Sequence, residues 1–121
     1  MLAKVAQLSW AAGLFDGEGC IRCSPSTQAK RHGYNSVATQ ITMTQKGTID
    51  NPPDILTRFA DLLPGGKIYK ERDDLWRYTI SKKWYVRAAL KSMLPWFGQR
   101  RTDQSHECIR AINNSPYKVK Q

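Results

Sequence analysis

The sequence has no apolar run long enough to cross a membrane and too few cysteines for a disulfide framework. A membrane-spanning helix needs about 20 consecutive apolar residues, and no stretch approaches that length. The N-terminal stretch lacks the apolar core of a secretory signal peptide. Three cysteines cannot all pair within one chain, which favours a reducing compartment. We therefore expect an intracellular protein, cytoplasmic or organellar, with no membrane partner.

Acidic residues are scarce relative to basic ones. The chain has 10 Asp and Glu against 19 Lys and Arg, which gives a formal net charge of +9. Such a balance points to a polyanionic partner, and nucleic acid is the default. Apolar residues at 40% and aromatic residues at 10% exclude a disordered basic tail. At 121 residues, we expect a single domain spanning 1–121.

One stretch near the N-terminus, WAAGLFDGEG, predicts a small-residue helix that ends in two acids. Gly13 and Gly17 lie one helical turn apart, and with Ala12 they would let another backbone approach closely. Asp16 and Glu18 fall at the negative end of the helix dipole, where carboxylates are unfavourable unless a cation lies nearby. This conflict between local preference and sequence indicates a functional site.

Alternating apolar and polar residues predict four β-strands. The predicted strands are 20–26, 36–44, 67–71 and 75–81. In the second and clearest strand, Val37, Ile41 and Met43 would face inward. The opposite face of the strands carries long donors and hydroxyls, which suit the reading of base edges in a major groove. An ordinary solvated sheet face would also be polar, so the alternation by itself leaves both interpretations open.

Four helices are expected around these strands. The N-terminal helix is followed by one capped by Asn51 and stopped by a Pro-Gly-Gly run. Ser81 is predicted to cap the next helix, which Pro95 ends. A basic connector at 98–101 then leads to a last helix at about 102–113. The order α-β-β-α-β-β-α-α predicts an α+β fold, with helices covering one face of a four-stranded antiparallel sheet.

The stretch from Ala12 to Gly19 resembles the signature of the LAGLIDADG homing endonucleases, with Phe15 in place of Ile and Glu18 in place of the second Asp. The order of elements, the Thr-Gln-Lys ending of the second strand and the Gly-Gly-Lys-Ile-Tyr opening of the third are also similar to that family. The resemblance covers nearly the whole chain. It implies the LAGLIDADG fold, whose sheet forms a DNA-binding saddle.

The resemblance also implies an activity, a partner and a cofactor. Family members with one motif act as homodimers, and this chain has one motif. We therefore expect a homodimeric homing endonuclease that cuts double-stranded DNA at a long pseudo-palindromic site by Mg²⁺-dependent phosphodiester hydrolysis, leaving 3′ overhangs. Mn²⁺ or Ca²⁺ are further candidate cations for the site. An intron RNA maturase, or a non-cleaving DNA-binding protein of the same fold, remains the alternative.

The family's metal-binding acid corresponds to Glu18, and the backbone carbonyl of Gly17 is implied as a second ligand. Two such acids, one from each subunit, would meet at the dimer axis. Two carboxylates at such a short separation raise each other's pKa unless a cation lies between them. Carboxylate oxygen is a ligand that Mg²⁺ prefers. The resemblance also places the dimer interface at the motif helix, with Ala12, Gly13, Asp16 and Gly17 as its candidate residues.

Two further positions correspond to active-site residues of the family. Gln45 matches a polar position at the edge of the active site, and Met43 would take that position if the strand slipped by two residues. Arg100 falls where the family often keeps a basic residue, usually Lys, with Arg101 as the alternative in a neighbouring register. Because arginine does not deprotonate, it can stabilise phosphate charge but cannot act as a base.

The candidate DNA contacts are polar residues of the open sheet face and of the loop between the first two strands. They are Arg22, Ser24, Ser26, Gln28, Lys30, Arg31, Tyr34, Ser36, Gln40, Thr42, Thr44, Lys67, Tyr69, Glu71, Arg77 and Thr79.

Overall fold

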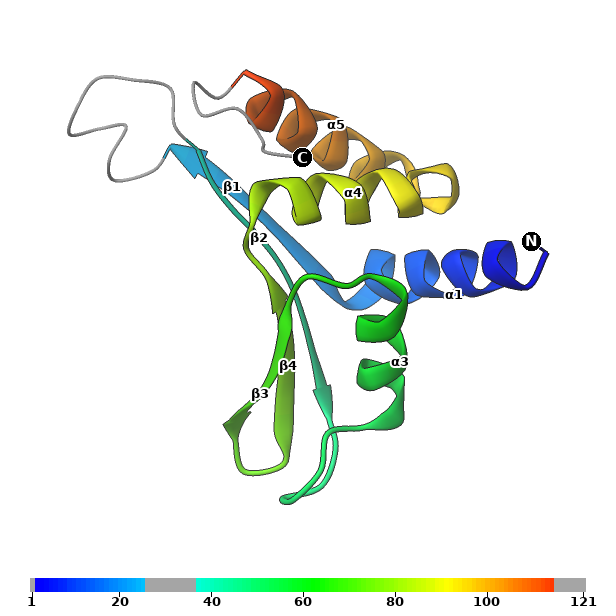
Figure 1. Ribbon diagram of the computed structural model, residues 1–121, viewed down its shortest axis with the longest axis vertical. Coiled ribbons are helices and arrows are strands. Elements are labelled where there is room, and N and C mark those ends of the chain that lie inside the picture. The colour runs from blue at the N-terminus through cyan, green and yellow to red at the C-terminus, as the bar shows by residue number, and fades with distance from the viewer. Residues whose placement is uncertain (1, 26–36, 115–121) are drawn as a thin grey trace.

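The computed structural model describes residues 2–25 and 37–114 and confirms the predicted α+β order (Figure 1). The elements are α1 (Leu2–Glu18), β1 (Gly19–Pro25), β2 (Val37–Lys46), α3 (Asp54–Leu62), β3 (Lys67–Arg72), β4 (Leu75–Ile80), α4 (Lys83–Met93), the short 3-10 helix η1 (Leu94–Trp96) and α5 (Gln99–Asn113). No helix among the described residues is long and apolar enough to cross a membrane.

The strands form one antiparallel sheet in the order β1-β2-β4-β3. Figure 1 shows the helices gathered on one side of this sheet. No described helix covers the opposite side, as the sequence predicts. A register shift between Lys70 and Arg72 marks a bulge near the end of β3.

The core lies between the sheet and the helices. Val37, Ile41 and Met43 of β2 are buried, as predicted, at 8%, 2% and 1% exposure. Phe15 of α1 is fully buried, and its ring lies 6.1 Å from the ring of Phe59 in α3. Since burying one large apolar side chain contributes about 1.5–3 kcal/mol, these contacts fix α1 firmly against the sheet and α3.

The turn from α1 into β1 contains no connecting residue, because the helix ends at Glu18 and the strand begins at Gly19. A Cβ atom added at Gly19 would collide with the ring of Phe15. Glycine therefore lets the strand start directly beneath the helix end.

Several predicted boundaries were wrong. Residues 99–101 form the first turn of α5 rather than a connector, with Gly98 at the N-cap. Asn51 is not a helix cap, because it belongs to a turn in which its amide donates to Thr48 Oγ1 at 3.0 Å. The cap positions are instead Pro53 and Lys82, and neither makes a side-chain capping bond.

Ser81 and Pro95 also differ from the prediction. The Ser81 carbonyl accepts a bond from Thr39 Oγ1 at 3.1 Å, which ties it to the sheet, and α4 begins two residues later at Lys83. Pro95 lies within η1, so the chain continues past the end of α4 as one tight turn. The strands agree with their predicted ranges to within two residues.

Candidate active site and nucleic-acid interface

The motif helix α1 has a buried face and an exposed small-residue face. Phe15 and Ala12 are fully buried in the chain's own core. Gly13 and Gly17 are exposed, and a Cβ atom at either would meet nothing within 4 Å. The structure therefore separates Ala12 from the two glycines with which the sequence grouped it, because about 100° of helical rotation divides neighbouring residues.

A buried arginine lies at the C-terminal end of α1. Arg101 of α5 is only 4% exposed, and its Nη2 donates to the carbonyls of Asp16 at 3.1 Å and Gly19 at 3.0 Å. The last turn of α1 has no basic residue of its own, and a cation stabilises this negative end of the helix dipole. Arg101 supplies that cation from a distant part of the sequence.

Burial lowers the pKa of Arg101, and the neighbouring charge of Arg100 acts in the same direction, whereas Asp16 raises it. Arginine nevertheless stays protonated in proteins. The guanidinium carbon also lies 5.2 Å from the centroid of the Phe15 ring. Its charge is therefore enclosed by carbonyls, a carboxylate and a ring, and it faces away from solvent.

Asp16 links the end of α1 to the start of α5. Its Oδ2 accepts a bond from the Gly98 amide at 2.8 Å, and its Oδ1 lies 3.7 Å from Arg101 Nε. The N-terminus of a helix favours a carboxylate, so Asp16 is stabilised by α5 even though it sits near the wrong end of α1. The assignment of Asp16 to the dimer interface stays a prediction, and within the chain Asp16 makes these two contacts.

Glu18 has a different environment from Asp16. It is the exposed last residue of α1, and no described residue makes a hydrogen bond or an ion pair with its side chain. No group of three metal-binding side chains occurs among the described residues. The chain thus presents a carboxylate without a partner among the described residues, beside the open backbone of Gly17. These are hard oxygen donors of the kind that Mg²⁺ prefers. A complete metal site needs further donors beyond these two groups.

Burial distinguishes the two pairs of alternative active-site residues that the sequence left open, Gln45 or Met43 and Arg100 or Arg101. Met43 lies in the core, whereas Gln45 is half-buried near the end of β2, and Met43 pairs with Gly19 directly after the motif. Arg101 is buried, whereas Arg100 is exposed in the first turn of α5. Gln45 and Arg100 are therefore the accessible members of the two pairs.

The predicted polar face exists on the open side of the sheet. Cross-strand pairs join Arg22 to Gln40 and Tyr69 to Arg77, which places their side chains on one face. Arg77 forms an ion pair with Glu71. The face residues that the structure describes are Arg22, Ser24, Gln40, Thr42, Thr44, Lys67, Tyr69, Glu71, Arg77 and Thr79.

The register adds further exposed residues to this face that the sequence prediction had left out, among them Cys20 and Lys46. Strict alternation along β1 and β2 was the signal that would have found both. The other predicted DNA contacts, Ser26, Gln28, Lys30, Arg31, Tyr34 and Ser36, lie outside the described residues.

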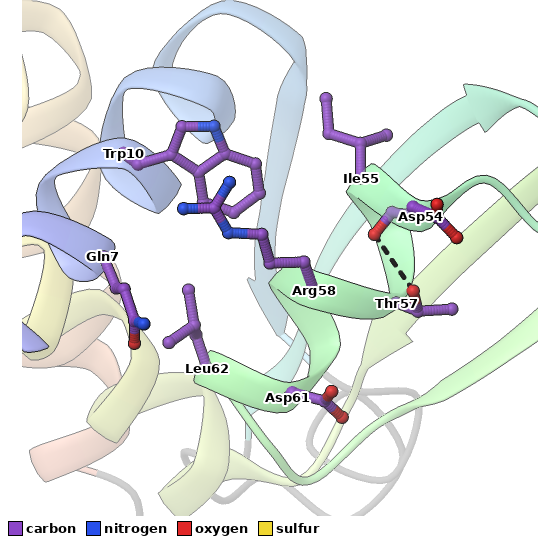
Figure 2. Close-up of a pocket in the computed structure, with 8 residues that line it drawn as sticks. All are labelled: Gln7, Trp10, Asp54, Ile55, Thr57, Arg58, Asp61 and Leu62. Carbon is purple, nitrogen blue, oxygen red and sulfur yellow. Dashed lines mark hydrogen bonds between the residues drawn. The ribbon is translucent and has the colours of Figure 1, made fainter.

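A groove of about 650 Å³ lies between α1 and α3. Figure 2 shows the Arg58 guanidinium lying across the indole of Trp10, with its central carbon 3.8 Å from the ring centroid. Trp10 precedes Gly13 by three residues, so both lie on one side of α1. The groove is lined by Gln7, Trp10, Asp54, Ile55, Thr57, Arg58, Asp61 and Leu62.

Solved structures share this fold. The homing endonuclease I-CvuI in complex with its target is 22% identical with a TM-score of 0.77, and the match covers 96% of this chain and 71% of that one. I-LtrWI bound to target DNA is 20% identical with a TM-score of 0.67, covering 91% of this chain and 39% of that one. No curated protein matches the chain.

A family model described as LAGLIDADG endonuclease matches residues 11–101. That match begins inside the motif helix and ends at Arg101 of α5. It therefore contains the whole sheet and the candidate active-site residues Glu18, Gln45 and Arg100. Together with the motif and the fold, it shows that the chain belongs to the LAGLIDADG endonuclease family.

Proposed function

We propose that the protein is a homodimeric, Mg²⁺-dependent homing endonuclease that cuts both strands of a long pseudo-palindromic DNA site and leaves 3′ overhangs. The observation that carries this proposal is Glu18, an exposed carboxylate without a partner among the described residues, at the end of a helix whose outer face is open. Family membership supplies the reaction class.

The outer face of α1 supports the homodimer. Positions 6, 9, 10, 13 and 17 lie on one side of the helix and carry no charged residue. Gly13 and Gly17 leave room for a second helix backbone to approach. Two-fold packing of α1 against its copy would bring the two Glu18 carboxylates together.

The oxygen donors of Glu18 and of the Gly17 carbonyl would hold the metal. When bound, Mg²⁺ supplies an activated water and stabilisation of the departing 3′ oxygen. Gln45, half-buried near the end of β2, would orient water by hydrogen bonding. Arg100, exposed beside the buried Arg101, stabilises phosphate charge without acting as a base.

The open sheet face supports DNA binding. Gln and Arg side chains form paired contacts with base edges in the major groove, and this face carries Gln40, Arg22 and Arg77. The net charge of +9 suits the phosphate backbone. Solved structures of I-CvuI and I-LtrWI hold their own target DNA.

The proposal is tested by incubating the protein with a randomised DNA library and Mg²⁺ and sequencing the cut ends. Wild type should produce staggered ends at one related set of sites. Glu18→Gln should reduce cleavage at least 100-fold, since it removes the charged metal donor. It should bind the recovered site with nearly unchanged affinity, measured by fluorescence anisotropy.

Glu107→Gln, an exposed carboxylate on α5, is the matched control and should cleave like wild type. Specific binding by wild type without cleavage would contradict the endonuclease and indicate the non-cleaving alternative. Cleavage by Glu18→Gln at the wild-type rate would remove Glu18 from the mechanism.

A further inference from the structure

The position of Arg101 has a chemical consequence for the site at the end of α1. A helix leaves its last four carbonyls without partners inside the helix, and in α1 these belong to residues 15–18. Arg101 Nη2 lies 3.5 Å from the Phe15 carbonyl, 3.1 Å from that of Asp16 and 3.0 Å from that of Gly19. The carbonyl of Gly17 receives no bond from Arg101.

Arg101 cannot itself contact a phosphate. Its side chain is 5% exposed and is surrounded by Asp16, Gln104 and the Phe15 ring. Removing one partner of a buried charge is strongly unfavourable, so the guanidinium, the Asp16 carboxylate and the three carbonyls stabilise one another as a unit. A buried arginine so placed acts on the end of α1 and not on DNA.

This unit connects the backbone segments that carry the two candidate active-site side chains, Glu18 and Arg100. Asp16 binds the Gly98 amide at the start of α5, and Glu18 follows Asp16 by two residues. Arg100 precedes Arg101, so anchoring Arg101 inward turns Arg100 outward in the same helical turn. The separation of Glu18 and Arg100 is therefore fixed by contacts between α1 and α5.

We infer that Arg101 is a positioning residue: its guanidinium, held by Asp16, fixes the last turn of α1 so that Glu18 and the Gly17 carbonyl face a shared divalent cation. This inference rests on the proposed function. It assigns the two neighbouring arginines different tasks, with Arg100 at the phosphate and Arg101 beneath the metal-binding turn.

The test replaces Arg101 by lysine. Arg101→Lys keeps the charge but loses the planar fork that spans several acceptors. A misplacement of about 1 Å can lower a rate by about 100-fold, so we expect kcat with Mg²⁺ to fall roughly 10- to 100-fold. Affinity for the recovered DNA site in EDTA should stay within about threefold.

A second readout is independent of cleavage. Ca²⁺ is titrated calorimetrically into the protein–DNA complex, and Arg101→Lys should weaken its binding roughly tenfold. Asp16→Asn keeps an acceptor for Gly98 but removes the charge that holds Arg101. Asp16→Asn should also lower kcat and weaken Ca²⁺ binding. It replaces Arg101→Lys as the test variant if Arg101→Lys does not fold.

The control is Tyr78→Phe, which removes a buried hydroxyl bonded to Leu63, at the C-cap of α3, and to Gly66, just before β3. It should lower stability while leaving kcat and Ca²⁺ affinity unchanged. Arg101→Lys and Asp16→Asn with wild-type kcat and Ca²⁺ affinity would overturn the inference alone. A wild type that neither cleaves DNA nor binds Ca²⁺ on it would overturn the proposed function, and this inference with it.

Discussion

Two acids at the end of α1 lie two residues apart and have different surroundings. Asp16 is bonded to the N-terminus of α5 and paired with a buried arginine. Glu18 is exposed and makes no side-chain bond or ion pair with any described residue. The sequence showed that carboxylates at this helix end are unfavourable unless a cation lies nearby, and in the structure Arg101 lies beside Asp16. The sequence could not identify Arg101 as this cation, because Arg100 and Arg101 differ only in the direction set by the first turn of α5.

The buried hydroxyl of Tyr78 gives a testable prediction about stability at the scale of a single residue. Its ring is 3% exposed, and its hydroxyl donates to the Leu63 carbonyl at 2.5 Å and accepts from the Gly66 amide at 3.2 Å. Tyr78→Phe leaves those backbone groups without their partner, which costs about 1–3 kcal/mol. Urea denaturation at pH 7 measures the loss, and an unchanged midpoint would contradict the role of the hydroxyl.

The pH dependence of stability follows from the same residue. Burial raises the pKa of Tyr78 above its ordinary value of 10.0, and Asp61 adds to the rise. The folded state therefore holds the proton more tightly than the unfolded state. This stabilisation is fully present below pH 10 and is lost as the pH rises through the folded pKa.

Wild type should accordingly lose stability more steeply above pH 10 than Tyr78→Phe does. Thermal unfolding between pH 8 and pH 11 measures the difference. Parallel curves for the two proteins would show that another group controls the alkaline transition.

At the scale of elements, α1 combines a buried face with an open one. Its buried face packs through Phe15 onto Phe59 of α3, and its open face exposes Gly13 and Gly17. Small residues one turn apart predicted the open face correctly. The assignment of Ala12 to that face depended on sequence proximity, whereas helical rotation puts it in the core.

Gly13→Leu tests the open face. Nothing lies within 4 Å of an added Cβ, and leucine forms helices better than glycine by about 0.5–1 kcal/mol. The variant should therefore fold at least as stably as wild type, while the added side chain blocks packing of α1 against its copy. Sedimentation at micromolar concentration should show a dimer for wild type and a monomer for the variant.

Ala88→Leu, at an exposed position on α4, is the control and should remain dimeric. A dimeric Gly13→Leu would move the proposed interface away from α1. A monomeric wild type, both alone and with DNA, would contradict the homodimer.

At the scale of the molecule, the sheet separates a helical layer from a polar face. Strand register puts residues distant in sequence next to one another, such as Thr42 beside Thr79. The described strand residues among the proposed DNA contacts thus form one surface. The basic groups of the described helices lie on the other side of the sheet.

Arg22→Gln tests which surface faces DNA. Loss of a base-edge contact by Arg22 should cost about 1–3 kcal/mol of binding free energy, measured by anisotropy on the recovered site. Lys91→Gln on α4 removes the same charge from the helical layer and should leave the affinity unchanged. Equal changes for both variants would contradict the open face as the DNA-binding surface.

The sequence by itself determined the order of elements, the inward residues of the strands and the motif with its two acids. These follow from local periodicity and from residue types whose chemistry does not depend on distant partners. Helix starts were less predictable, because Asn51 and Ser81 bind the turn and the strand near them instead of a helix end.

Only the tertiary structure decided how α5 completes the end of α1. Burial of Arg101 and the bond from Gly98 to Asp16 depend on two elements more than 80 residues apart meeting in space. Two adjacent arginines, or two acids two residues apart, look alike in a sequence. Packing against a distant helix gives one member of each pair a partner and leaves the other exposed.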